Sequence, residues 1–142
     1  MNRRALLTAA LLALPAGRPS SPLAGATPHR RRPTGREVWL RTELFFGTRR
    51  PGGEVSEEEF ARFVDKEVSP RFPDGLTLLT GYGQHLNLQG TMTRERSRVL
   101  ILFYPALVGN PGKKIDEIRE AYKLAYAQES VLRVESYNVV SF

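Results

Sequence analysis

Hydrophobic and polar residues alternate imperfectly along the first of four strand-like stretches, and the third of these stretches is the most hydrophobic run in residues 37–142. This pattern is typical of strands with one buried face. The stretches are Glu37–Phe46, Leu76–Leu86, Arg94–Tyr104 and Ser130–Glu135, with Tyr137–Phe142 extending or following the last. Turn residues separate them, among them Pro51-Gly52-Gly53 and Asn110-Pro111-Gly112.

Two other stretches have apolar residues at helical spacing. The first begins at Ser56, which forms a capping-box pattern with Glu59, and its apolar stripe continues to Val68. Pro70 ends this helix, because a proline disfavours helical backbone at the residue before it. The second stretch, Lys113–Gln128, predicts a longer helix.

The predicted order is strand, helix, strand, strand, helix, strand within residues 37–142. This order is typical of an α+β, ferredoxin-like βαββαβ sandwich, in which a four-stranded antiparallel sheet carries both helices on one face. The same elements in another α+β order remain the alternative. The length of 142 residues fits one such domain.

Charge and cysteine content narrow the classes of function. The net charge of +6 comes from the N-terminal segment, because residues 1–36 hold seven arginines and no acidic residue. Residues 37–142 are close to neutral and lack the basic footprint of a nucleic-acid-binding domain. The chain has no cysteine, which excludes disulfides, zinc–thiolate sites, iron–sulfur clusters and thiol catalysis.

The N-terminus has the three regions of an export signal. Arg3 and Arg4 precede the apolar run Ala5–Leu14, and Ala24-Gly25-Ala26 is a small-residue cleavage pattern. The run is too short to be a transmembrane helix, which needs about 20 residues. We therefore expect a signal peptide at 1–26, a disordered basic linker at 27–36 and a periplasmic or extracellular protein. A disordered extension or a misplaced start codon is the alternative, and Sec and twin-arginine export stay open.

Strand parity assigns side chains to the two faces of the sheet. The helix-covered face is expected to hold Leu40, Leu44, Ser97, Val99, Ile101, Phe103, Leu132 and Val134. The other face is expected to hold Trp39, Arg41, Glu43, Phe45, Arg96, Arg98, Leu100, Leu102, Val131, Arg133 and Glu135. A sheet face this apolar is typical of an interaction site.

Three hypotheses account for that second face. It is a lattice of cross-strand ion pairs, the interface of a homodimer, or a site where arginines hold a small anionic ligand. The candidate ligand-binding residues are Arg41, Glu43, Tyr82, Arg98 and Arg133. Whether the protein is an enzyme stays undecided, because the sequence contains no recognisable nucleophile–base pair.

Other polar residues give weaker indications. His85 as a general base lacks an identified orienting carboxylate, and we expect Glu95 to be solvated or ion-paired near a hairpin end. No cluster of ligand residues indicates a metal, and no motif indicates a cofactor. These observations favour a small binding or interaction module that pairs through the second sheet face. A small-molecule enzyme with a polar pocket on that face is the alternative.

Seven segments carry a resemblance to a known family. They are Arg41–Gly47, Val55–Phe60, Val68–Thr77, Gly81–Gln84, Arg94–Val99, Ile118–Lys123 and Gln128–Val134. On these segments the chain resembles a family of exported bacterial proteins, domain of unknown function 3574. The resemblance implies an exported single domain and brings no activity, substrate or catalytic residue. Many members look like lipoproteins with a cysteine after the signal, which this chain lacks.

Overall fold

The computed structural model describes residues 35–106 and 109–142. Its elements are β1 (Glu37–Gly47), β2 (Arg49–Arg50), β3 (Gly53–Glu54), α1 (Glu57–Phe63), the π-helical turn η1 (Val64–Val68), β4 (Thr77–Leu86), β5 (Met92–Tyr104), α2 (Pro111–Tyr126) and β6 (Leu132–Val140). The predicted signal peptide 1–26 and most of the linker 27–36 lie outside the described residues. Within the described part, no helix has the length and apolar character needed to cross a membrane.

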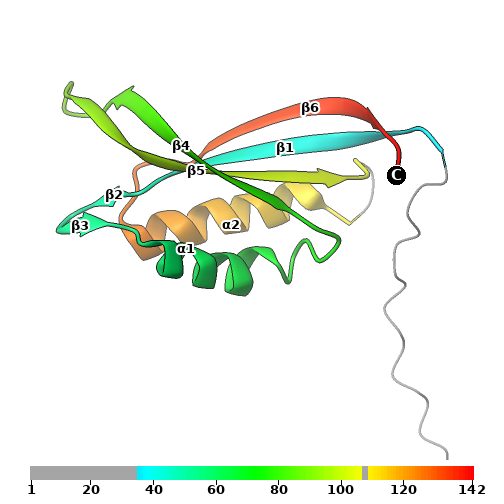
Figure 1. Cartoon of the computed structure of the whole chain (residues 1–142), viewed down its shortest axis with the longest axis horizontal. Helices are drawn as coiled ribbons and strands as arrows, with labels where there is room; N and C mark the ends of the chain where they lie inside the picture. The colour runs from blue at the N-terminus through cyan, green and yellow to red at the C-terminus, as the bar shows by residue number, and fades with distance from the viewer. Residues whose placement is uncertain (1–34, 107–108) are drawn as a thin grey trace, which may run out of the picture.

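The long strands form one sheet in the order β4-β5-β1-β6, and each neighbouring pair is antiparallel. The predicted α+β class is therefore confirmed, with a four-stranded antiparallel sheet and two helices. Figure 1 shows that the β4–β5 hairpin reaches past the ends of both helices. The last strand is one continuous element, Leu132–Val140, so the segment after Glu135 extends the predicted strand rather than following it as a separate element.

The first helix begins where the capping box predicts. The Ser56 side chain accepts a hydrogen bond from the Glu59 N–H, and the Glu59 carboxylate accepts one from the Ser56 N–H. The α-helix ends at Phe63, and the backbone continues as η1 to Val68. The sequence pattern did not distinguish these two kinds of helical turn, because the apolar stripe runs through both.

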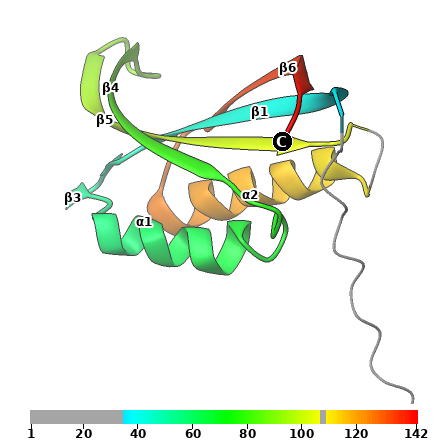
Figure 2. The same cartoon turned by 45° about the vertical axis from the view of Figure 1, so that its right-hand side comes forward.

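The core forms around Phe46 of β1. Its ring contacts Phe60 and Phe63 of α1 at centroid distances of 5.5 and 6.1 Å, and Tyr122 of α2 at 4.6 Å. The helices lie side by side along the sheet (Figures 1 and 2). Phe46 and Tyr122 are fully buried, so these rings join both helices to the sheet.

Burial alternates along β1 as predicted but contradicts the predicted faces of β5 and β6. Leu44 pairs with Leu100 and with Arg133, and directly opposite residues share a sheet face. The residues wrongly placed with Arg41 therefore belong to the other face; they are Arg96, Arg98, Leu100, Leu102, Val131, Arg133 and Glu135. Conversely, the face of Arg41 includes Ser97, Val99, Ile101, Phe103, Leu132 and Val134. The parity of β5 was ambiguous because residues 99–103 are all apolar.

Candidate functional site

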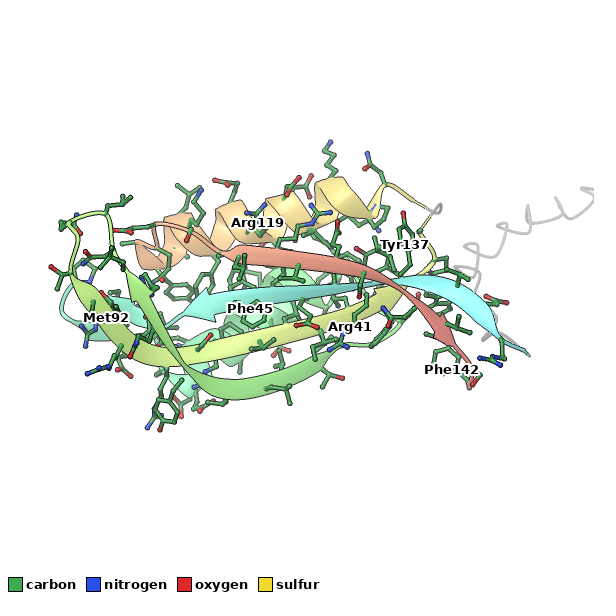
Figure 3. All side chains as sticks on the ribbon, turned by 90° about the horizontal axis from the view of Figure 1, so that it is seen from above. Arg41, Phe45, Met92, Arg119, Tyr137 and Phe142 are labelled. Atoms are coloured by element: carbon green, nitrogen blue, oxygen red, sulfur yellow. The ribbon has the colours of Figure 1, made fainter. Side chains whose placement is uncertain are left out.

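The sheet face that carries Arg41 is the more exposed one, and we call it the open face. The strand register arranges its side chains in rows that cross the sheet. One row is Leu79–Val99–Phe45–Leu132, and the next is Thr77–Ile101–Glu43–Val134. A third row consists of Phe103, Arg41 and Ser136. Figure 3 looks down on the sheet from above, with Phe45 and Arg41 labelled along it. The open face is thus largely apolar.

Arg41 and Glu43 form the charged centre of the open face. The Arg41 Nη2 lies 2.7 Å from the Glu43 Oε1, and both side chains are partly exposed. The Arg41 guanidinium also lies 5.8 Å from the centroid of the Phe103 ring. The Arg41 Nε is buried and has no hydrogen-bond partner among the described residues. These two predicted site residues therefore lie together, framed by apolar side chains.

Arg98 lies on the core side instead, opposite Phe46. Its side chain is only 6% exposed, and its Nη2 lies 2.6 Å from Glu57 Oε1 of α1. The Arg98 Nη1 donates a hydrogen bond to Thr80 Oγ1 at 2.6 Å. The buried guanidinium is thus enclosed between α1 and the sheet.

Arg133 also lies on the core side, in a polar network next to α2. It contacts Glu135 Oε1 at 2.5 Å and Asp116 Oδ1 at 3.1 Å. Glu135 in turn accepts a hydrogen bond from the Thr42 hydroxyl, which lies 2.5 Å from the Tyr104 hydroxyl. Burial raises the pKa of Tyr104 above its ordinary value. The network connects β1, β5, β6 and α2 and explains why charged residues occupy the core side of β6.

Tyr82 lies in the β4–β5 hairpin, opposite Arg96, and is 85% exposed. Among the five predicted ligand-binding residues, the structure thus brings together only Arg41 and Glu43. Arg41, Arg98 and Arg133 do not converge on one anion, because the first faces away from the other two.

A second polar cluster surrounds Glu95, which lies near the turn of the β4–β5 hairpin. The side chain of Glu95 is only 7% exposed, so it is not solvated, and its ion-pair neighbour among the described residues is His85. Its Oε2 accepts a hydrogen bond from the Arg49 N–H at 2.6 Å, and its Oε1 lies 3.7 Å from His85 Nδ1. The structure therefore supplies the carboxylate that His85 lacked in the sequence.

Glycine makes room for this carboxylate. A Cβ atom on Gly47 would lie 2.8 Å from Glu95 Oε1 and 2.8 Å from Gln128 Oε1. Gln128 is held in place because its Nε2 donates to the Arg49 carbonyl at 2.6 Å. Tyr122 fixes Gly47 itself by donating to its carbonyl at 2.8 Å. The signal in the sequence was the change from Phe45 to Gly47 on one strand face.

These residues border a cavity of about 380 Å³, which we call the Glu95 pocket. Its lining includes Arg49, His85, Thr93, Glu95, Gln128 and Ser130. A cavity of this size can admit a small polar molecule. The described residues contain no group of three or more His, Cys, Asp or Glu side chains suited to a metal ion.

Solved structures share this fold. A phage SAM lyase in complex with S-methyl-5'-thioadenosine is 12% identical, with a TM-score of 0.58, and the match covers 80% of this chain and 95% of that one. A phage SAM lyase in its apo state is 14% identical, with a TM-score of 0.52, covering 72% and 89%. At this identity the likeness shows the fold alone.

None of the curated proteins matches the sequence. The model of one protein family does, over residues 41–142, which include β1 from Arg41 onward, both helices and all the residues of the two clusters described above. The chain belongs to the family of proteins of unknown function DUF3574.

Proposed function

We propose that this protein is a small interaction module that pairs with a second copy of itself through the open face of its sheet. The observation that carries the proposal is the apolar row Leu79–Val99–Phe45–Leu132, which crosses all four strands. Leu79 is 52% exposed and Leu132 58% exposed. Contiguous apolar surface of this kind is typical of binding sites.

The charges on the open face favour a second copy as the occupant. Arg41 and Glu43 lie two residues apart on one strand and carry opposite charges. A twofold axis passing near Thr42 would place Arg41 of each copy opposite Glu43 of the other. Such an isologous interface requires a self-complementary patch, and this ion pair provides one.

The flat area of the open face lies at the lower limit for a specific dimer. Four strands spaced about 4.8 Å apart, with nine residues rising about 3.3 Å each, present roughly 570 Å² of flat area. Specific interfaces begin at roughly 600 Å² per partner. We therefore expect a reversible dimer rather than an obligate one.

Sedimentation velocity over a range of protein concentrations tests the proposal. We expect a monomer–dimer equilibrium that Leu132→Lys shifts to monomer, because it places a charge within the apolar row. Leu124→Lys is the matched control, since Leu124 of α2 is 85% exposed and distant from the open face. A monomer at all concentrations would favour the ion-pair hypothesis, and a dimer insensitive to Leu132→Lys would place the interface elsewhere.

A small-molecule enzyme is the second candidate. The likeness of fold to the phage SAM lyases, with 95% of one such chain covered, supports it. Titration with S-methyl-5'-thioadenosine, followed by calorimetry, is a direct test. Saturable binding would support this candidate function. Absence of binding would argue against an enzyme that acts on a ligand of this kind.

Two further inferences concern context and topology. We infer export to the periplasm or beyond, supported by the signal pattern in residues 1–26. N-terminal sequencing of the exported protein tests it, and we expect Thr27 as the first residue.

We also infer a ferredoxin-like arrangement, supported by the strand order β4-β5-β1-β6 and by the contacts of both helices with Phe46.

A further inference from the structure

We propose that the Glu95 pocket binds the primary ammonium group of a small molecule. This site is separate from the Arg41–Glu43 pair on the open face. The proposal rests on the burial of Glu95, on the acceptor atoms gathered beside it, and on the cavity that they border.

The first step concerns the charge of Glu95. Its side chain is 93% buried, and a buried carboxylate is costly unless it is paired or hydrogen-bonded. One oxygen, Oε2, accepts the Arg49 N–H. The other, Oε1, has only His85 Nδ1 within ion-pair distance, at 3.7 Å, among the described residues. Oε1 therefore lacks a close donor from this part of the chain.

The neighbouring arginines do not fill this position. Arg94 and Arg96 flank Glu95 in β5, so their side chains point to the opposite face of the strand. The Arg94 Nε donates to Gln84 Oε1 at 2.8 Å. The charge of Glu95 is thus available to a group that enters the cavity.

The second step concerns the other polar atoms. Glu95 Oε1 and Gln128 Oε1 both lie close above Gly47, each 2.8 Å from the position of its missing Cβ. Carboxylate and amide oxygens both accept hydrogen bonds, so these two atoms form a pair of acceptors. An ammonium group has three N–H donors and no acceptor, so its donors match this set of acceptors.

Other ligand classes match less well. An anion would meet the carboxylate of Glu95. A divalent metal would find too few ligands, because the described residues contain no suitable group of three. Arg49 at the cavity lining could also contact a carboxylate on the same molecule, so an amino acid is a suitable larger probe.

NMR titration of the ¹⁵N-labelled protein tests the proposal with three probes: ethylamine, glycine and acetate. We expect saturable shifts of the amides around Glu95, Gly47 and Gln128 with ethylamine and glycine at millimolar concentration, and none there with acetate. Equal shifts with acetate, or no saturable shift with either amine, would overturn it.

Variants then connect the binding to the pocket. Glu95→Gln keeps an oxygen for the Arg49 N–H but removes the charge, so we expect ethylamine to bind at least tenfold more weakly. Glu120→Gln is the matched control, because Glu120 is exposed and pairs with Lys123 on α2. Equal affinity of Glu95→Gln and wild type would overturn the proposal.

A second variant covers the case in which Glu95→Gln fails to fold. Gly47→Ala changes no charge, but its methyl group occupies the space beside Glu95 Oε1 and Gln128 Oε1. Both contacted atoms are ends of flexible side chains, so the fold can adjust while the acceptors separate. We expect weaker ethylamine binding, and unchanged binding in a folded Gly47→Ala protein would overturn the proposal.

Discussion

Arg98 offers a sharp test of how this fold accommodates a buried charge. Its guanidinium is enclosed between β5 and α1, with Nη1 bonded to Thr80 and Nη2 paired with Glu57. The carbon at its centre lies 5.9 Å from the centroid of the Phe60 ring, and its Nε has no partner among the described residues. Two substitutions separate the contribution of the apolar stem from that of the charge.

Arg98→Ala removes the stem and leaves a space in the core beside Phe60. Truncation of a large buried side chain lowers the free energy of unfolding by about 2–4 kcal/mol. Arg98→Met keeps a linear apolar stem and removes the charge. Its former partners can be rehydrated, because Thr80 is exposed and the Glu57 side chain is 65% exposed. Since removal of the desolvated charge offsets the lost hydrogen bonds, we expect a net change of about 1 kcal/mol or less.

Urea denaturation followed by circular dichroism measures both free energies of unfolding. Arg96→Ala and Arg96→Met are the matched controls, because Arg96 lies two residues away on the same strand and is exposed. We expect both controls to stay within about 0.5 kcal/mol of wild type. If Arg98→Met destabilises the protein as much as Arg98→Ala, the charge rather than the packing of the stem carries the effect, and our reasoning is refuted.

Three further predictions concern helix ends and pH. Ala127 caps the C-terminus of α2 with left-handed backbone, at φ of 53°. Because glycine adopts this conformation more readily than alanine, Ala127→Gly should raise the free energy of unfolding by about 1 kcal/mol. An unchanged or lower Tm would contradict this. Ser56→Ala breaks the capping box with Glu59 and should cost about 1 kcal/mol in urea denaturation, whereas no loss would mean that α1 is held by packing alone. Burial raises the pKa of Tyr122 above 10, so above that pH the unfolded chain binds fewer protons than the folded one and stability falls. Tyr122→Phe should flatten this alkaline decline while costing about 1 kcal/mol at neutral pH for the lost bond to Gly47, and an equally steep decline would show that other groups cause it.

The elements of the fold were predictable because their signals are local. The capping box at Ser56 fixed the start of α1, and the long alternation from Glu37 gave β1 and the correct faces of its side chains. The short β2–β3 hairpin was predicted only as a turn, since two-residue strands leave no periodic signal. Local chemistry therefore sufficed for the existence of the long elements.

The candidate sites were less predictable because they depend on register and on distant partners. The prediction put the arginines of β5 on the face away from the helices, which is the wrong face for Arg98. The partner of Arg98 is Glu57 on α1, which is far away in sequence. The burial of Glu95 has a related cause. The space that buries it is created by Gly47 on a neighbouring segment of chain and by Gln128 beyond α2. In both cases the position of a charged side chain depends on contacts with residues far away in sequence, which the local pattern does not contain.

The position of the Glu95 pocket follows from a change of side-chain size along one face of β1. Arg41, Glu43, Phe45 and Gly47 point the same way because strand side chains alternate. The first three cover the sheet with the charged and apolar side chains of the open face. Gly47 has no side chain to cover the sheet, and the residue opposite it on β5 is the small Ser97. The apolar surface therefore ends there, and the vacated space receives the carboxylate of Glu95 and the amide of Gln128. Apolar contact and polar recognition thus occupy successive positions of the same strand, and their boundary lies between Phe45 and Gly47.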